Sequence, residues 1–211
     1  KPKENKKSEE IKTDFIADAS HELRTPLTVI KNTTELLKNV DDKKTKNKFL
    51  NIANKQINNM TKLLDKLIEL SRIENAAKVK NSSVTDIKKV ITDSINQRKQ
   101  IVAANDQILT YTKSKKISIL AEESDVSTII NNIIDNAIKY SGKNSKINIT
   151  TSIIENKNNK ELVLVKIKDN GIGIEEKHLP KIKDRFYRVD KARSKSSNSS
   201  GLGLSIVKSL L

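Results

Sequence analysis

The chain has 211 residues, which allows one large or two modest domains, and with 35% hydrophobic and 3% aromatic residues its cores rest mainly on Ile, Leu and Val. It has no cysteine, which excludes disulfides and thiolate metal sites, and no apolar run approaches the roughly 20 residues needed to cross a bilayer. Its net charge of +15 suggests an anionic partner. The lysines are scattered and not interleaved with aromatic residues, however, so we expect no nucleic-acid partner. We expect a soluble, intracellular piece with no secretory signal.

Two long helices are predicted first, over about 5–39 and 47–75, with a turn at 40–45. The second helix carries a heptad seam made of Leu50, Ala53, Ile57, Met60, Leu64, Leu67 and Ser71. Two antiparallel helices bury little surface alone, and pairing two such hairpins gives a four-helix bundle. The pattern therefore predicts a homodimer. The alternative is that the helices pack on a second domain of the same chain.

The segment HELRTPL at 21–27 places a histidine on the first predicted helix. At helical spacing His21 faces away from the seam, and Glu22 can lie beside one ring nitrogen and accept its proton while the other attacks an electrophile. Pro26 removes a backbone donor, so we expect a bend near the reactive ring. Alternatively, His21 is an ordinary exposed residue on a charged helix face.

The remainder of the chain reads as a second domain after a linker at 76–83. We expect a helix near 84–104, strands near 107–112 and 116–120, a helix near 125–140, and a strand hairpin over 145–154 and 161–168 that turns at 156–159. An irregular basic segment at about 175–200 is interpreted as a lid, followed by a short final helix. The fold class is therefore α+β, in which residues 1–75 form the hairpin and residues 84–211 form an α/β sandwich with helices on one face of a mixed sheet.

The segment NNIIDNAIKY at 131–140 predicts an amphipathic helix with a functional polar face. Its buried stripe comprises Ile130, Ile133, Ile134 and Ala137, and its other face carries Asn132, Asn136, Lys139 and Tyr140. Two amides one turn apart, followed by a cation, can hold hydrated Mg²⁺ and the phosphates that the ion bridges. The alternative is an ordinary surface helix in a chain rich in lysine and asparagine.

Two glycine-containing segments complete a possible nucleotide site. DNGIGI at 169–174 follows a predicted strand, so Asp169 can accept a hydrogen bond from an exocyclic amine while the glycines let the backbone approach a flat ligand. GLGL at 201–204 opens the final helix, where backbone amides suit phosphate. Either segment alone could be a simple turn or a loop-to-helix junction. Among the basic residues of 177–195, Arg188 is our first candidate for a phosphate contact and Arg185 the second.

Together these segments resemble the catalytic core of two-component sensor histidine kinases. HELRTPL is similar to the family's phospho-acceptor box, NIIDNAIKY to its asparagine box, DNGIGI and GLGL to its glycine boxes, and RFYR at 185–188 to its phenylalanine box. The nucleotide portion also resembles the wider superfamily of gyrase, chaperone and mismatch-repair ATPases. Only the histidine box separates the kinases from those relatives, among which His21 would be incidental.

The resemblance implies a role for each matching residue. His21 would be phosphorylated by ATP, with Glu22 handling the proton and Thr25 acting in the reverse, phosphatase reaction. Asn136 would bind Mg²⁺ with help from Asn132, and Asp169 would recognise adenine. The remaining nucleotide-binding residues would be Lys139, Tyr140, Gly171, Gly173, Arg188, Gly201, Leu202 and Gly203.

The resemblance also implies partners and a location. The phosphoryl group would pass to an aspartate of a response-regulator receiver domain. The hairpin would form the dimeric four-helix bundle, and the piece would be the cytoplasmic part of a sensor that is anchored in a membrane by other segments.

Three departures from the family pattern support a second reading. Lys183 stands where an aromatic residue is usual, Ser199 stands where a glycine is usual, and the chain stops at Leu211, before the strands that normally complete the sheet. The alternative function is a signalling scaffold, or a phosphatase-biased member, that dimerises and binds a regulator but handles nucleotide weakly.

Overall fold

The computed structural model describes residues 2–75, 82–112, 117–155, 158, 160–189 and 200–211, with side chains described from residue 13 onward. The chain separates into two compact units. The first comprises Lys1–Glu74 and Lys183–Ser205, and the second comprises Asn75–Ile182 and Ile206–Leu211. The predicted linker at 76–83 lies mostly outside the described residues, as does most of the turn at 156–159.

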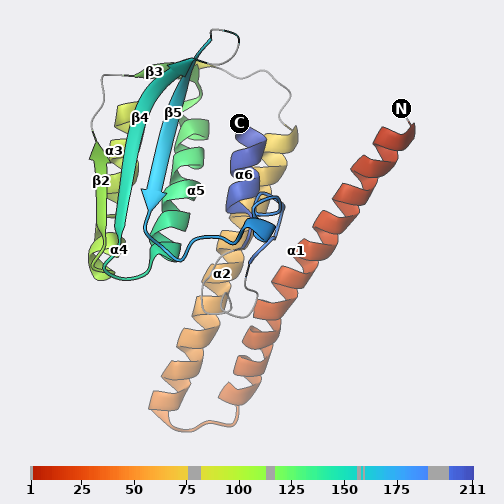
Figure 1. The fold of residues 1–211 in the computed structure, drawn as a ribbon. Helices are drawn as coiled ribbons and strands as arrows, with labels where there is room; N and C mark the ends of the chain where they lie inside the picture. The colour runs from red at the N-terminus through yellow and green to blue at the C-terminus, as the bar shows by residue number, and fades with distance from the viewer. Residues whose placement is uncertain (1, 76–81, 113–116, 156–157, 159, 190–199) are drawn as a thin grey trace. The chain divides into compact units, whose positions relative to one another are not determined.

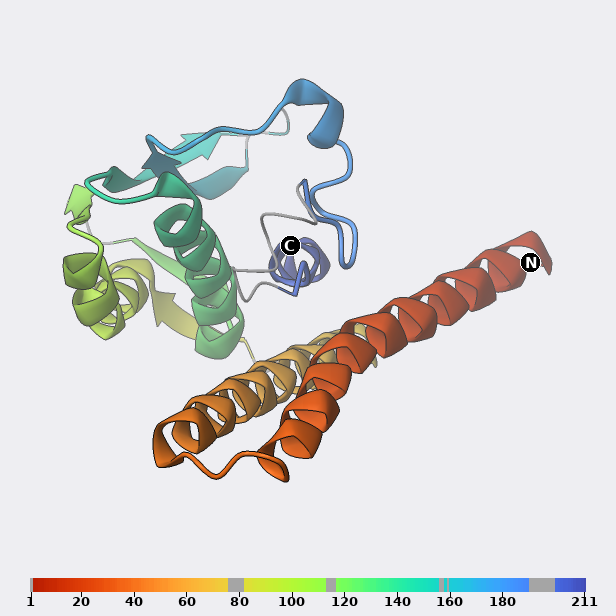
Figure 2. The same ribbon diagram turned by 90° about the horizontal axis from the view of Figure 1, so that it is seen from below.

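The first unit is built on a helical hairpin of α1 (Pro2–Leu37) and α2 (Lys43–Asn75), whose helices diverge from their connecting turn (Figures 1 and 2). The helix α1 continues through Pro26. The second helix begins at Lys43 and not at 47 as predicted, because Asp42 caps it. The Asp42 carboxylate accepts hydrogen bonds from the backbone N–H groups of Lys44 and Thr45, at 3.3 and 2.8 Å.

The cap makes the hairpin sensitive to acid. Hydrogen bonds from Thr45, and then from the Lys44 backbone, hold the pKa of Asp42 below its ordinary value of 3.8. The folded chain thus binds fewer protons at this site than the unfolded chain, so the stability that the carboxylate contributes at neutral pH is lost progressively as the pH falls below about 4, towards the lower pKa of the folded chain. We expect the melting temperature to fall less between pH 7 and pH 3 in Asp42→Asn, which keeps a capping oxygen but cannot titrate, than in the wild type. Equal falls, measured by circular dichroism, would contradict this.

The predicted heptad seam is only partly covered within one chain. Ala53 is buried and Met60 is half-buried, but Leu50, Ile57 and Leu64 remain 47%, 48% and 44% exposed. One edge of the predicted apolar stripe on α2 is therefore open to solvent.

The second unit is an α/β sandwich, as predicted (Figure 1). Its strands are β1 (Ser83–Asp86), β2 (Ile108–Thr112), β3 (Ser118–Ala121), β4 (Lys146–Glu155) and β5 (Glu161–Asp169). Its helices are α3 (Ile87–Gln97), α4 (Lys99–Ala104), α5 (Glu123–Ser141) and the 3₁₀ turn η1 (Glu176–His178). The last helix, α6 (Gly203–Leu210), spans the boundary between the two units.

The sheet is mixed. Its order is β2–β4–β5, in which β2 lies parallel to β4 and β4 lies antiparallel to β5. A separate antiparallel pair joins β1 to β3. The helix predicted over 84–104 is wrong at its start, because the β-branched Val84 and Thr85 pair with β3 and the buried Thr85 hydroxyl donates to the Ala121 carbonyl at 2.8 Å.

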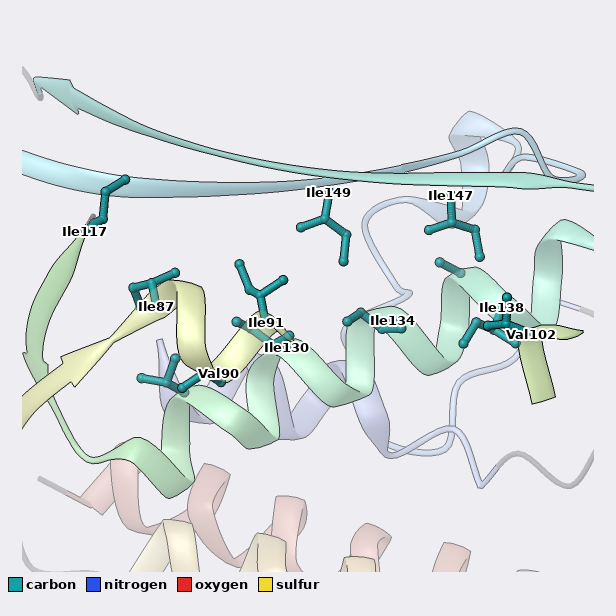
Figure 3. Close-up of a cluster of buried hydrophobic side chains, with 12 residues drawn as sticks. Ile87, Val90, Ile91, Val102, Ile117, Ile130, Ile134, Ile138, Ile147 and Ile149 are labelled. Carbon is teal, nitrogen blue, oxygen red and sulfur yellow. The ribbon is translucent and has the colours of Figure 1, made fainter. Parts of the chain in front are cut away.

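The core of this unit is aliphatic, as the composition predicts. Figure 3 shows Ile147 and Ile149 of β4 facing Ile91 of α3 and Ile134 of α5, and all four side chains are completely buried. The predicted stripe on α5 is buried except at Ile133, which is half-buried, and it continues to Ile138. This packing fixes which face of α5 points away from the core. None of the helices in the described part of the chain combines the length and the apolar character that a membrane span needs.

Candidate functional site

The predicted phospho-acceptor lies in the middle of α1 and is exposed. The Thr25 hydroxyl donates to the His21 backbone carbonyl at 3.4 Å, and Glu22 is half-buried. The exposure of His21 agrees with the prediction that it faces away from the seam. An exposed imidazole is accessible to an incoming phosphoryl group.

The residue next to this histidine contacts the C-terminal part of the same unit. Arg188 Nη1 lies 3.8 Å from Glu22 Oε2, and the Arg188 side chain is only 15% exposed. The arginine predicted to meet phosphates is thus held one residue from His21. A guanidinium in this position can neutralise charge on a phosphoryl group as it reaches the imidazole.

A second contact between these segments was not predicted from the sequence. The rings of Phe15 and Phe186 are 6.0 Å apart, and the Arg185 guanidinium lies 5.0 Å from the centre of the Phe15 ring. Arg185 Nη2 also contacts Glu74 Oε1 at 2.5 Å. The motif RFYR identified Phe186 and Arg185, but Phe15 and Glu74 carry no local signal, since only the fold brings them to this place.

The second glycine segment is packed against the same cluster. Phe186 has a left-handed backbone with φ 58°, and a Cβ on Gly201, whose φ is 69°, would lie 2.7 Å from the Phe186 carbonyl carbon. The Gly201 backbone is therefore in close contact with the Phe186 backbone, and its predicted approach to a ligand stays a prediction. Leu202 is fully buried, its backbone N–H donates to the Ser200 hydroxyl at 3.4 Å, and Gly203 is the first residue of α6.

In the second unit, the polar face of α5 carries the four predicted residues. Asn132 Nδ2 donates to the Thr128 carbonyl at 2.9 Å, which leaves its carbonyl oxygen to meet a ligand, and Asn136 is half-buried one turn later. Lys139 Nζ lies 4.9 Å from the centre of the Tyr140 ring, which is 42% exposed. A cation and an aromatic surface thus stand together at the end of this helix.

The first glycine segment lies against that end of α5. Asp169 is the last residue of β5, is exposed, and accepts from the Gly171 backbone N–H at 2.9 Å through Oδ1. A Cβ on Gly171 would lie 2.5 Å from the Tyr140 carbonyl oxygen, so only glycine fits there. Gly173 has φ 69° and open space around it. The fold thus brings Asp169 and Gly171 beside Tyr140, so residues of the two predicted nucleotide-binding segments lie next to each other.

The predicted residues fall into two groups according to the unit that carries them. His21, Glu22, Thr25, Arg188, Gly201, Leu202 and Gly203 belong to the first unit. Asn132, Asn136, Lys139, Tyr140, Asp169, Gly171 and Gly173 belong to the second.

The polar residues on α5 suit magnesium only together with a phosphate ligand. No group of three or more His, Asp or Glu side chains that could hold a metal occurs in the ranges that the structure describes. Two amide oxygens one turn apart offer the hard oxygen ligands that Mg²⁺ prefers, with phosphate oxygens and water completing its shell. Asn132 and Asn136 fit this incomplete set.

Two family patterns match the chain in the order in which these features occur. Residues 11–76 match the His Kinase A (phospho-acceptor) domain. Residues 121–211 match the histidine kinase-, DNA gyrase B- and HSP90-like ATPase domain. The first match covers the hairpin with His21, and the second covers α5 and both glycine segments.

Individual relatives agree with these matches. The chain is 32% identical over 212 residues to the sensor protein kinase WalK of Staphylococcus aureus and covers 50% of it, and it is 29% identical over 210 residues to the sensor histidine kinase WalK of Bacillus subtilis and covers 34% of it. Each match includes 99% of this chain, which thus spans a third to a half of the length of these relatives.

The fold also agrees with a solved structure of histidine kinase ThkA in complex with response regulator protein TrrA. The TM-score is 0.72 at 21% identity, over 87% of this chain and 53% of that one. The chain therefore belongs to the two-component sensor histidine kinases, and it carries both the phospho-acceptor and the ATPase region of their catalytic core.

Proposed function

We propose that the chain uses ATP to phosphorylate His21 and that the phosphoryl group then passes to an aspartate of a response regulator. The observation that carries this proposal is the exposed His21, whose neighbour Glu22 lies 3.8 Å from Arg188. Arg188 is the residue that the family resemblance assigns to the phosphates. An acceptor, a neighbouring carboxylate and a phosphate-binding cation thus occur in one compact unit.

The chemistry of the first step follows from these groups. A ring nitrogen of His21 attacks the terminal phosphorus of ATP, so that an N–P bond forms and the bond from phosphorus to the leaving oxygen of ADP breaks. Glu22 accepts the proton that the imidazole loses, and Arg188 neutralises charge on the transferring oxygens. In this proposal Thr25, one turn after His21, acts in the reverse, phosphatase reaction. The rate depends mainly on positioning and charge neutralisation.

The second unit supplies the nucleotide-binding residues in this proposal. Asp169 accepts a hydrogen bond from the exocyclic amine of adenine, and the lack of side chains at Gly171 and Gly173 leaves room for the flat ring. Lys139 approaches the phosphates, and Tyr140 lies beside the nucleotide. Asn136, with Asn132, would hold Mg²⁺, which when bound neutralises phosphate charge. The first unit supplies the glycine segment at 201–203, whose backbone N–H groups are proposed to bind phosphate.

The response regulator and the location are also inferred. The similar kinase ThkA was solved with a response regulator protein, which supports a receiver domain as the partner of this chain. A phosphohistidine is a reactive donor and suits a relay of this kind. The greater length of the sensor kinase relatives supports a cytoplasmic piece of a longer, membrane-anchored sensor.

The hairpin is proposed to form a homodimer through the exposed edge of the α2 seam. The exposed residues, at heptad spacing, are Leu50, Ile57 and Leu64, and each is nearly half exposed. Apolar side chains in this pattern are typical of a helix face that packs against a helix of a second copy. We expect Ile57→Lys to shift the chain from dimer to monomer at tens of micromolar, measured by sedimentation equilibrium. The matched control is Asn58→Lys, which adds the same charge at the exposed next position and should stay dimeric. A monomeric wild type at this concentration would contradict the proposal.

Two observations favour the alternative, a scaffold or phosphatase-biased member. The Gly201 backbone is packed against Phe186, where a phosphate would otherwise approach, and Lys183 replaces the usual aromatic residue of the lid. Calorimetry with a non-hydrolysable ATP analogue separates the two functions. Weak but measurable binding supports the kinase, and undetectable binding at millimolar analogue supports the scaffold.

A further inference from the structure

Gln107 is a buried polar residue that no sequence motif identifies. It lies directly before β2 and is 7% exposed. Its side-chain Nε2 donates two hydrogen bonds, to the Ile138 carbonyl at 2.8 Å and to the Gly142 carbonyl at 2.7 Å. Both acceptors belong to the C-terminal end of α5, where backbone carbonyls lack partners within the helix. Gln107, which precedes β2, therefore caps this helix end with its side-chain amide.

The same helix end is also held by the glycine segment at 169–174. The Ile172 backbone N–H donates to the Tyr140 carbonyl at 3.4 Å. A Cβ on Gly171 would lie 2.5 Å from that carbonyl oxygen and 2.8 Å from Ser141 Cα, so the two backbones are in direct contact. The turn that carries Lys139 and Tyr140 is thus fixed between Gln107 and the loop that follows Asp169.

The hydrogen bonds of the Gln107 side chain indicate that its role in the fold is to donate hydrogen bonds and not to accept them. Both hydrogens of Nε2 are used, whereas the buried Oε1 has no hydrogen-bond partner in the described part of the chain. A buried carbonyl oxygen without a partner destabilises the fold, and an apolar residue of similar length would avoid that penalty. A side chain that only filled space would not need an amide here.

We propose that Gln107 is a positioning residue for nucleotide binding, which holds the last turn of α5 in register with the loop after Asp169. The proposal rests on the proposed function, because it assumes that Tyr140, Lys139 and Asp169 meet the nucleotide. Losing the two donated bonds frees the Ile138 carbonyl to turn away and leaves the Gly142 carbonyl with only the Ser145 hydroxyl as a donor, at 2.9 Å. The Tyr140 and Lys139 side chains then lose their fixed distance from Asp169, and nucleotide affinity falls although none of these three residues is changed.

The test compares Gln107→Met, which keeps the length but donates no hydrogen bond, with Ile149→Val, a core control in β4. Binding of a non-hydrolysable ATP analogue with Mg²⁺ is measured by calorimetry at a temperature where circular dichroism finds every variant folded. We expect at least fivefold weaker binding for Gln107→Met and a change of less than twofold for Ile149→Val. We also expect the rate of His21 labelling at saturating ATP to stay within twofold of the wild type, because positioning for binding affects KM more than kcat.

Gln107→Glu gives a second, pH-dependent signature. Its carboxylate cannot donate to the two carbonyls, but its protonated form can donate to one, and burial beside carbonyl oxygens raises the pKa of such a carboxyl. We expect the affinity of Gln107→Glu to recover as the pH is lowered from about 8 to about 6, relative to the wild type at each pH. Binding by Gln107→Met within twofold of the wild type, or no pH-dependent recovery in Gln107→Glu, would overturn this inference alone. A wild type that binds no analogue would overturn the proposed function as well.

Discussion

Replacing His21 with glutamine is expected to abolish phosphorylation by ATP. Glutamine has a similar size and can form hydrogen bonds, but it has no nucleophilic ring nitrogen to form the N–P bond. In the wild type, incubation with γ-labelled ATP and Mg²⁺ should produce a label that is lost in acid and stable in alkali. His21→Gln should reduce this label to background, whereas the fold should not change, because His21 is exposed on a helix.

The chain provides a matched control for this experiment. Its second histidine, His178, ends the 3₁₀ turn η1. His178→Gln should keep the label at the wild-type level. Acid-labile label that survives His21→Gln would contradict the kinase assignment and favour an ATP-driven machine of the wider superfamily, in which His21 has no chemical role.

The second large effect is expected at Asp169. Asp169→Asn should weaken binding of an ATP analogue by about 1.5–3 kcal/mol, or roughly ten- to 150-fold, the usual contribution of a hydrogen bond to a charged group. The substitution is informative because an asparagine oxygen can still accept the Gly171 N–H, which now bonds Asp169 Oδ1 at 2.9 Å. The loop should therefore keep its shape while the charged acceptor for the adenine amine is lost.

Asp93→Asn is the control for the change in net charge, since Asp93 is exposed on α3 within the same unit. It should bind the analogue like the wild type in isothermal titration calorimetry. If Asp169→Asn also binds like the wild type, the adenine contact is misplaced, although the kinase assignment would stand.

Much of the fold could be predicted from local pattern. The stripe of Ile130 and Ile134 predicted a helix with a buried face because helical periodicity repeats along 19 residues of α5. The start of the helix predicted at 84 was wrong because Val84 and Thr85 suit either structure, and their pairing with β3, more than 30 residues away, decides between them. The cap at Asp42 was missed because the charged run VDDKKT offers several possible first residues for α2.

The residues of the candidate site likewise divide into those that local sequence motifs identify and those that only the fold brings together. His21, Asn136 and Asp169 could be selected because their chemistry is carried by short motifs. Gln107 and Phe15 could not be selected, because their contacts join segments that the sequence separates by 31 and 171 residues, from Gln107 to Ile138 and from Phe15 to Phe186. Gly201 was predicted to let the backbone approach a ligand, and the sequence could not say that the Phe186 backbone would lie beside it.

Locating the phosphoryl group in the wild-type protein decides whether an accessible His21 receives phosphorus from ATP. The chain is incubated with ATP and Mg²⁺, the N–P bond is detected by ³¹P NMR at alkaline pH, and the modified peptide is sequenced by mass spectrometry. We predict a phosphohistidine resonance and a phosphoryl group on His21. A phosphoryl group found on His178, or only on serine, threonine or tyrosine, would contradict the claim.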